Sequence, residues 1–447
     1  MEDLERKRKE YVGRDVLAPA RLEQLRGLPQ VREELVKLIQ ALKSWERLEC
    51  RLPAGALFKG PPGTGKTLAA RILATESGLK LVDGTNFPRA QGHWEPDDIV
   101  SLFTMARSLG KPVIIHFEEL ADFWKNPSSK TELQTALLSQ LDGISGRPSG
   151  VFVVACTNEF SKIPPQFLRP GRLSKVIEFN MNSEGRKEVF RYYLSRKPLD
   201  SFDVESLLSS LPDSISPAAI EELVEDAHLA SILEGSDRIR EGHLVRGLLE
   251  YALGPPHGGW ENEQERWVAC VHEAGHVLAG LALGIGIKMV VVPKQNYREG
   301  VTVREKNEPR PKDWLEEEIC FLLAGKVAER MVLGCETLDT ADDAGKATSY
   351  SLDYFSMFET ETNYQIEELI GIAGSDEVSP LKPLPERERD AIYSRARELR
   401  ERCAKRAEEI LLGFGREAIE RLAREIRERE YLLRRELESL VGQLRRG

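Results

Sequence analysis

The sequence predicts a multidomain chain in which a parallel α/β unit precedes a small helical subdomain and a mainly α-helical second unit. Residues 53–182 alternate short apolar runs with amphipathic stretches, a pattern typical of a parallel sheet covered by helices on both faces. Strand-like runs stop after this region, and the segment GPPHGGW at 254–260 is rich in Gly and Pro and lacks periodicity. We therefore expect domains at 1–182, 183–253 and 261–447, with 254–260 as the linker.

The individual elements follow from the length and period of each apolar run. Before the α/β unit, Val31, Leu35 and Leu42 share one face of a predicted helix. Strands are expected at 55–58, 80–83, 113–117, 151–155 and 176–179, and helices at 67–77, 97–108 and 130–141. In the second unit we expect a helix over 263–283, a hairpin joining 289–292 to 300–304, helices from 314 to the end, and an amphipathic tail helix packed on its own domain.

Composition limits the classes of protein to which this chain can belong. Its 447 residues are 41% hydrophobic and 30% charged, which is a globular composition. The net charge of −10 disfavours a general nucleic-acid binder. Six scattered cysteines without a CxxC pair favour a reducing compartment. The longest apolar run, 277–287, is shorter than the ~20 residues needed to cross a bilayer. We expect a soluble, cytoplasmic protein with no membrane span.

A phosphate-binding loop lies between the first predicted strand and the next helix. Residues 60–67 read GPPGTGKT, a full match to G-x-x-x-x-G-K-[ST]. The glycines allow backbone N–H groups to surround an anion at a helix N-terminus. Lys66 would reach the β- and γ-phosphates of ATP, and the Thr67 hydroxyl would hold Mg²⁺. The expected nucleotide-binding residues here are Gly60, Pro61, Pro62, Gly63, Thr64, Gly65, Lys66 and Thr67.

Two carboxylates follow the strand predicted at 113–117. Because α/β sheets bind ligands at the carboxyl ends of their strands, this position suits nucleotide chemistry. Glu118 would occupy the Mg²⁺ position, and Glu119 would orient the attacking water. Asp is the usual residue at the first position, so Glu118 extends the carboxylate by one methylene. The alternative is that both side chains only solvate the end of the strand.

Four segments together resemble an AAA+ ATPase. They are GPPGTGKT, FEE at 117–119, VVACTN ending at Asn158, and LRPGR at 168–172. The resemblance implies that Asn158 is the sensor that positions water and that Arg169 and Arg172 are arginine fingers. A finger that reaches the γ-phosphate of a neighbouring subunit requires a closed homo-oligomer, usually a hexamer. The alternative for both arginines is a surface salt bridge.

A second motif, HEAGH at 272–276, predicts a metal site. His272 and His276 are four residues apart on a predicted helix, so both imidazoles project from one face and suit one zinc ion. Glu273 lies between them and can act as a general base. A catalytic zinc needs a third protein ligand, and spacing alone leaves several carboxylates open. The candidates are Glu329, Asp339, Asp342 and Asp343.

The wider pattern resembles the FtsH-type ATP-dependent zinc proteases. It consists of HEAGHVLAG, LLAGKVAERMVLG at 322–334 and DTADDAGKATS at 339–349. The resemblance implies that Asp343 is the third zinc ligand. Glu329 is then either a residue that supports one of the ligands or the rival candidate for the third ligand. An ungapped match places Gln91-Gly92-His93 where the family has an aromatic-Val-Gly pore loop, with Trp94 next. The family's two N-terminal transmembrane helices have no counterpart, so we expect a soluble form.

Two hypotheses about function follow. The first is an ATP-dependent zinc metalloendopeptidase that degrades polypeptides, in which an ATPase ring delivers substrate to the zinc site and the strand at 289–292 pairs with extended substrate. The second is an AAA+ remodelling ATPase or scaffold with weak or ATP-independent peptidase activity, which the altered pore loop favours. ATP-stimulated casein cleavage that a zinc chelator blocks would separate the two.

Overall fold

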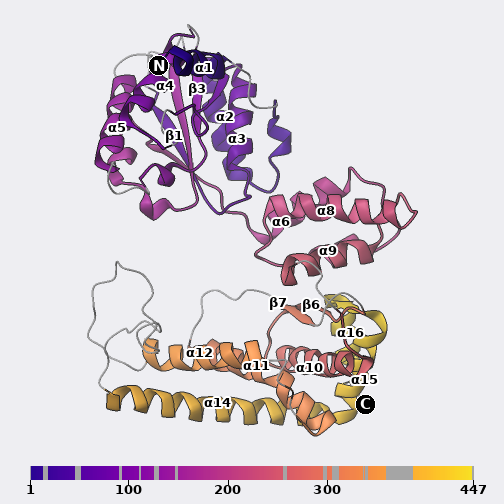
Figure 1. Cartoon of the computed structure of the whole chain (residues 1–447). Coiled ribbons are helices and arrows are strands. Elements are labelled where there is room, and N and C mark those ends of the chain that lie inside the picture. The colour runs from indigo at the N-terminus through magenta and orange to yellow at the C-terminus, as the bar shows by residue number, and fades with distance from the viewer. Residues whose placement is uncertain are drawn as a thin grey trace. The chain divides into compact units, whose positions relative to one another are not determined.

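The structure is a computed structural model that describes residues 2–13, 19–45, 52–89, 93–109, 112–124, 130–145, 150–254, 259–294, 300–304, 312–335, 337, 341–358 and 386–444. Its internal contacts divide the chain into two compact units. The first comprises Met1–Pro198 with Ile215–Glu225, and the second comprises Leu199–Ser214 with Asp226–Gly447. Each unit is described by itself below (Figure 1).

The first unit contains a parallel sheet, as the sequence predicts. Among the described residues its strand order is β2-β3-β4-β1-β5, and every neighbouring pair is parallel. The strands are β1 (Gly55–Lys59), β2 (Lys80–Asp83), β3 (Val113–Phe117), β4 (Val151–Thr157) and β5 (Lys175–Glu178). All five expected strands are thus confirmed, with ends that shift by at most two residues. Because β3, β4 and β1 are adjacent, their carboxyl ends lie side by side, where ligands bind in such sheets.

Helices cover this sheet on both faces. Figure 1 shows α2 (Pro29–Lys43) and α3 (Lys66–Ser77) on one side and α4 (Pro96–Arg107) and α5 (Lys130–Ser145) on the other. Leu57, Ile115 and Val153 are buried in the core under α4 and α5 because a doubly covered strand exposes neither face. The remaining elements are α1 (Glu2–Gly13) and the short 3₁₀ helices Leu22–Gln24, Leu120–Trp124, Phe160–Lys162 and Pro165–Leu168.

Short helices follow the sheet, as the loss of strand patterning predicts. They are α6 (Ser183–Leu194), α7 (Val204–Ser209), α8 (Pro217–Leu233) and α9 (Glu241–Leu253). The Asn182 side chain caps α6 by accepting a hydrogen bond from the Gly185 amide, and Asp203 caps α7 in the same way. The start of α8 belongs to the first unit, where Ala218 N–H donates to Gly63 O at 3.2 Å. This contact places α8 against the phosphate loop.

The second unit is mainly helical and is built around α10 (Glu263–Ala282). That helix is almost wholly enclosed, and it packs against α11 and α15. The other helices are α11 (Lys312–Leu333), α12 (Ala341–Phe358), α14 (Glu386–Phe414), α15 (Arg416–Arg429) and α16 (Arg434–Leu444). On α14 the side chains of Ala396, Leu399 and Cys403 are buried in the same core, which confirms that the tail packs on its own domain.

The predicted hairpin is present, but it belongs to a three-stranded antiparallel sheet. β6 (Ile287–Val291) pairs with β7 (Val301–Arg304) on one side and with β8 (Tyr431–Leu433) on the other. The expectation that the strand at 289–292 pairs with substrate is therefore wrong, because β8 already occupies the free side of β6. In the described residues the outer edge of β7 is unpaired.

Within the described part of the chain, no helix combines the length and the apolar character needed to span a bilayer.

Candidate functional site

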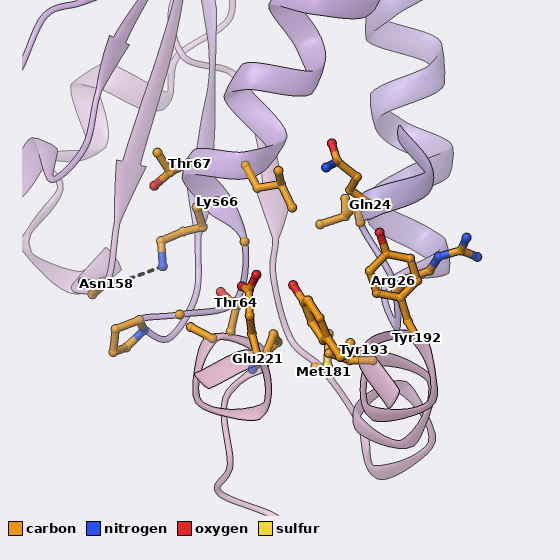
Figure 2. A pocket seen from close by; sticks show the side chains of 18 of the residues that line it. Gln24, Arg26, Thr64, Lys66, Thr67, Asn158, Met181, Tyr192, Tyr193 and Glu221 are labelled. Atoms are coloured by element: carbon orange, nitrogen blue, oxygen red, sulfur yellow. Dashed lines mark hydrogen bonds between the residues drawn. The ribbon is translucent and has the colours of Figure 1, made fainter. Parts of the chain in front are cut away.

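The phosphate loop encloses the side chain of Lys66. This residue begins α3 and is buried, and its Nζ donates to the carbonyl oxygens of Gly60 and Pro61 and to Asn158 Oδ1, each at 2.7 Å. Figure 2 shows Lys66 reaching from the loop towards Asn158. Burial lowers the pKa of Lys66, whereas the nearby carboxylates of Glu118 and Glu119 oppose that effect. The Lys66 amino group thus lies where phosphate oxygens would bind.

The two acidic residues at the end of β3 have different partners. Glu118 Oε1 accepts a hydrogen bond from the Thr67 hydroxyl, so the two groups assigned to Mg²⁺ lie together. Glu119 accepts from the Thr157 hydroxyl and, at 2.7 Å, from the Asn158 amide. Since Thr157 is the last residue of β4 and Asn158 follows it, the adjacency of β3 and β4 fixes Glu119 beside the phosphate loop. The structure therefore brings these sequence-predicted residues into one cluster.

A cavity of about 340 Å³ extends from the loop to residues that sequence reasoning missed. These additional lining residues include Gln24, Arg26, Met181, Tyr192, Tyr193 and Glu221 (Figure 2). Burial raises the pKa of Tyr193, and the charge of Glu221 adds to that effect. The residues come from a segment before the sheet, from the link between β5 and α6, and from α6 and α8, so no single sequence motif predicts them.

The two arginines of LRPGR have different surroundings. Arg172 binds Asp142 through two hydrogen bonds, Nε to Oδ1 at 2.6 Å and Nη2 to Oδ2 at 2.8 Å, and it also donates to Gln166 O. The Asp142 bonds raise the pKa of Arg172. Arg169 is exposed. For Arg172 this is the arrangement that the salt-bridge alternative predicts, while the finger role of both residues stays a prediction.

Trp94 is a packing residue in this structure. It is 8% exposed and lies in the core cluster, with its ring stacked on Phe123 at a centroid distance of 4.7 Å. Phe87 and Phe117 surround the same ring. Gln91 and Gly92, which the sequence match places in the pore loop, lie outside the described residues. The buried position of Trp94 therefore does not support a role for its ring as a substitute for the family's pore aromatic.

The second site gathers three potential metal ligands on α10 and α12. His276 Nε2 lies 2.9 Å from both His272 Nε2 and Asp343 Oδ2, and His272 Nε2 lies 3.2 Å from the same Asp343 oxygen. All three are buried or half-buried, and their ligand atoms lie within 4.8 Å of one another. Two neutral imidazoles and one carboxylate suit a catalytic zinc, which takes three protein ligands and keeps an open position. The residues present therefore fit the metal.

The other ring nitrogen of each histidine, Nδ1, also has a hydrogen-bond partner, and this partner fixes the orientation of the imidazole. His272 Nδ1 lies 2.7 Å from Glu329 Oε1, and His276 Nδ1 lies 2.9 Å from Phe321 O. Glu329 is fully buried and accepts two more hydrogen bonds from Thr337, through the amide at 2.7 Å and the hydroxyl at 3.0 Å. This geometry makes Glu329 the orienting partner of His272 rather than a rival ligand.

The charges of this cluster depend on one another. Burial lowers the pKa of His272, but its hydrogen bonds to Asp343 and Glu329 outweigh burial and raise that pKa to about 9. Burial raises the pKa of Asp343, but hydrogen bonds from His272 and His276 bring it well below its usual range. Of the other sequence candidates, Asp339 and the side chain of Asp342 lie outside the described residues.

Close helix packing at the metal site depends on Gly325 of α11. A Cβ atom there would lie 2.3 to 2.6 Å from the ring atoms of His272, closer than any real contact. The sequence match over LLAGKVAER contains this glycine, but only the structure shows what it contacts. Any side chain at this position would displace the imidazole.

The proposed general base has a partner that sequence reasoning also missed. Glu273 is 7% exposed, and its Oε2 accepts a hydrogen bond from Thr302 Oγ1 of β7 at 2.6 Å. Thr302 is 29 residues away in the sequence, in a strand without a recognisable catalytic motif.

Two protein families match this chain. The "ATPase family associated with various cellular activities (AAA)" matches residues 56–181, which contain the phosphate loop, Glu118, Glu119 and the two arginines. "Peptidase family M41" matches residues 260–440, which contain the metal cluster.

Several curated proteins are similar to this chain over most of its length. "ATP-dependent zinc metalloprotease FtsH 3" of Sorangium cellulosum is 30% identical over 74% of this chain and 58% of its own length. The corresponding FtsH of Lactococcus lactis is 28% identical over 72% of this chain and 49% of its own length. FtsH 1 of Symbiobacterium thermophilum is 29% identical over 95% of this chain and 73% of its own length. The chain thus spans about half of the first two relatives, and it belongs to the FtsH-type zinc metalloprotease family.

Proposed function

We propose that this chain is an ATP-dependent zinc metalloendopeptidase that cleaves polypeptides. The observation that carries the proposal is the convergence of His272, His276 and Asp343 beside a buried Glu273. The same chain carries a phosphate loop whose lysine, hydroxyl and carboxylates also form one cluster.

ATP with Mg²⁺ would occupy the first site. Lys66 would bind the β- and γ-phosphates, and Thr67 with Glu118 would hold the metal ion. Glu119 is held by Thr157 and Asn158, so it can orient the attacking water without moving far. Arg169, which is exposed, would act on the nucleotide of a neighbouring subunit.

At the second site, zinc would be held by His272, His276 and Asp343, and when bound it polarises a carbonyl and makes water acidic. Glu273 takes a proton from the attacking water and returns it to the leaving amine. An extended substrate would pair with the outer edge of β7, which no described strand covers. Main-chain pairing requires no particular sequence, which suits a general endopeptidase.

The working form would be a homo-oligomeric ring, with a hexamer as the expected size. Support comes from the resemblance to AAA+ ATPases, which implies that an arginine finger completes the ATP site of the neighbouring subunit. The cytoplasmic location expected from composition stays a prediction.

One observation favours the second hypothesis, a remodelling ATPase or scaffold with weak or ATP-independent peptidase activity. Apart from His93, Trp94 is the one aromatic residue between Phe87 and Glu95, and it is buried. A chain without an exposed pore aromatic would pull substrate weakly.

Casein cleavage tests the proposal against this alternative. The wild-type chain should cleave casein faster with ATP than without, and a zinc chelator should stop cleavage. Glu273→Gln should retain ATP hydrolysis and lose cleavage, whereas Lys66→Ala should lose the ATP stimulation. Equal cleavage with and without ATP would favour the alternative, and cleavage that survives both chelator and Glu273→Gln would refute the metal site.

A further inference from the structure

Strand β7 and the glycine just before it lie against Glu273. Gly300 and Thr302 are two residues apart in extended chain, so they face the same side. Thr302 Oγ1 donates to Glu273 Oε2 at 2.6 Å. A Cβ atom on Gly300 would lie 2.7 Å from Glu273 Cγ and 3.1 Å from Oε1. Thr302 and the backbone at Gly300 therefore lie directly against the Glu273 side chain.

The Thr302 contact involves one of the two carboxylate oxygens of Glu273. Among the described residues, Oε1 has no hydrogen-bond partner, whereas Oε2 is held by Thr302. A carboxylate fixed at one oxygen has fewer side-chain orientations, and its second oxygen can accept a proton from water at a set position.

The position of Thr302 is set by the sheet rather than by a loop. Thr302 is the strand partner of Val290 in β6, and Val290 also pairs with Leu432 of β8. Because β6 pairs with a strand on each side, its own position is fixed, and pairing with it fixes the register of β7.

From these contacts we propose that Thr302 is a positioning residue for the peptidase reaction, which holds Glu273 so that Oε1 faces the attacking water. Gly300 completes the arrangement by leaving room for the Glu273 side chain. The inference rests on the proposed role of Glu273 as general base. It predicts that losing the hydroxyl slows catalysis without weakening substrate or zinc binding.

Peptide cleavage by matched variants tests this role. Thr302→Val keeps the branched shape but removes the hydroxyl, so kcat should fall about 10- to 100-fold while KM stays within about twofold. Thr302→Ser keeps the hydroxyl and should retain at least about half of kcat. Gly300→Ala keeps Thr302 intact but displaces Glu273, and it should lower kcat in the same way. Zinc content should stay at the wild-type value in all three, and Thr302→Ser should also keep the wild-type unfolding midpoint.

A binding measurement gives a readout that is independent of turnover. A peptide hydroxamate bound to zinc gives a proton to the general base, whereas the matching peptide thiol needs only the metal. Thr302→Val should weaken the hydroxamate about tenfold and the thiol less than about twofold. Unchanged kcat together with an unchanged hydroxamate-to-thiol ratio in Thr302→Val and Gly300→Ala would overturn the inference and leave the proposed function intact. A wild-type chain that takes up no zinc would instead overturn the proposed function.

Discussion

Replacing Glu329 by Gln is the sharpest perturbation of the metal site that leaves all three proposed ligands in place. Glu329 is fully buried, lies 2.7 Å from His272 Nδ1 and accepts two hydrogen bonds from Thr337. Glutamine keeps the shape and can still accept from His272 through its carbonyl oxygen. It removes the negative charge, however, and it turns an N–H₂ group towards the Thr337 amide, which then has no acceptor.

These changes set the expected magnitudes. Loss of an orienting carboxylate typically weakens metal binding 10- to 100-fold, which corresponds to about 1.4 to 2.7 kcal/mol. The unsatisfied Thr337 amide should lower the free energy of unfolding of the metal-free protein by about 1 to 3 kcal/mol. Competition with a chromophoric chelator measures the zinc affinity, and denaturant unfolding measures the stability.

A matched control is available on the same helix. Glu318 is also buried on α11, but its partner is Arg304 and not a histidine. Glu318→Gln should therefore keep zinc affinity within about twofold of wild type, while Asp343→Ala should lose zinc. If Glu329→Gln loses zinc as completely as Asp343→Ala, Glu329 is itself a ligand. If its zinc affinity equals that of wild type, the orientation argument is wrong.

Three further predictions follow from the same contacts. The pKa of His272 is raised to about 9 without metal, so below that pH the imidazole carries a proton that zinc must displace. The apparent zinc affinity should therefore rise about tenfold per pH unit between pH 7 and 8.5. A zinc affinity that does not change with pH would contradict this. Arg169→Ala should lower ATP hydrolysis without lowering nucleotide affinity, and mixing it with Lys66→Ala should partly restore hydrolysis; a monomer with full activity would exclude the finger role. Trp94→Ala should lower the free energy of unfolding by about 3 to 5 kcal/mol, since the ring is enclosed by three phenylalanines, and an unchanged denaturant midpoint would contradict its assignment to the core.

Local sequence patterns predicted most elements of this fold because each element has its own periodicity. Each strand of the parallel sheet is a short apolar run buried on both faces, and such a run can be recognised in the sequence without knowledge of the tertiary structure. Strand β8 could not be predicted in this way. Tyr431–Leu433 is a three-residue strand inside an Arg- and Glu-rich helical tail, and only pairing with β6 makes it extended.

In the candidate sites, too, residues within a local motif could be predicted, whereas residues brought in by tertiary packing could not. The phosphate loop and HEAGH were visible because their chemistry requires fixed spacing within one segment. Asp343 needed the family resemblance, since the sequence alone offered four carboxylates. Gly325 and Thr302 contact the site across helices and strands, so their roles depend on packing that no linear pattern encodes.

The two hypotheses about function differ in whether the chain unfolds its substrate, and the altered pore segment bears on that step. The burial of Trp94 removes the one large aromatic candidate of that segment. The zinc cluster and the phosphate loop nevertheless retain their expected residues in contact.

Degradation of a stably folded protein substrate, followed over time with and without ATP, tests the joint action of the two sites most directly. The proposed function predicts that wild-type protein consumes the folded substrate only with ATP. It also predicts that Glu119→Gln, which should bind ATP but hydrolyse it at least ~10²-fold more slowly, and Glu273→Gln, which should keep zinc, both leave the substrate intact. Consumption at the same rate without ATP, or by Glu119→Gln at the wild-type rate, would contradict an ATP-driven protease.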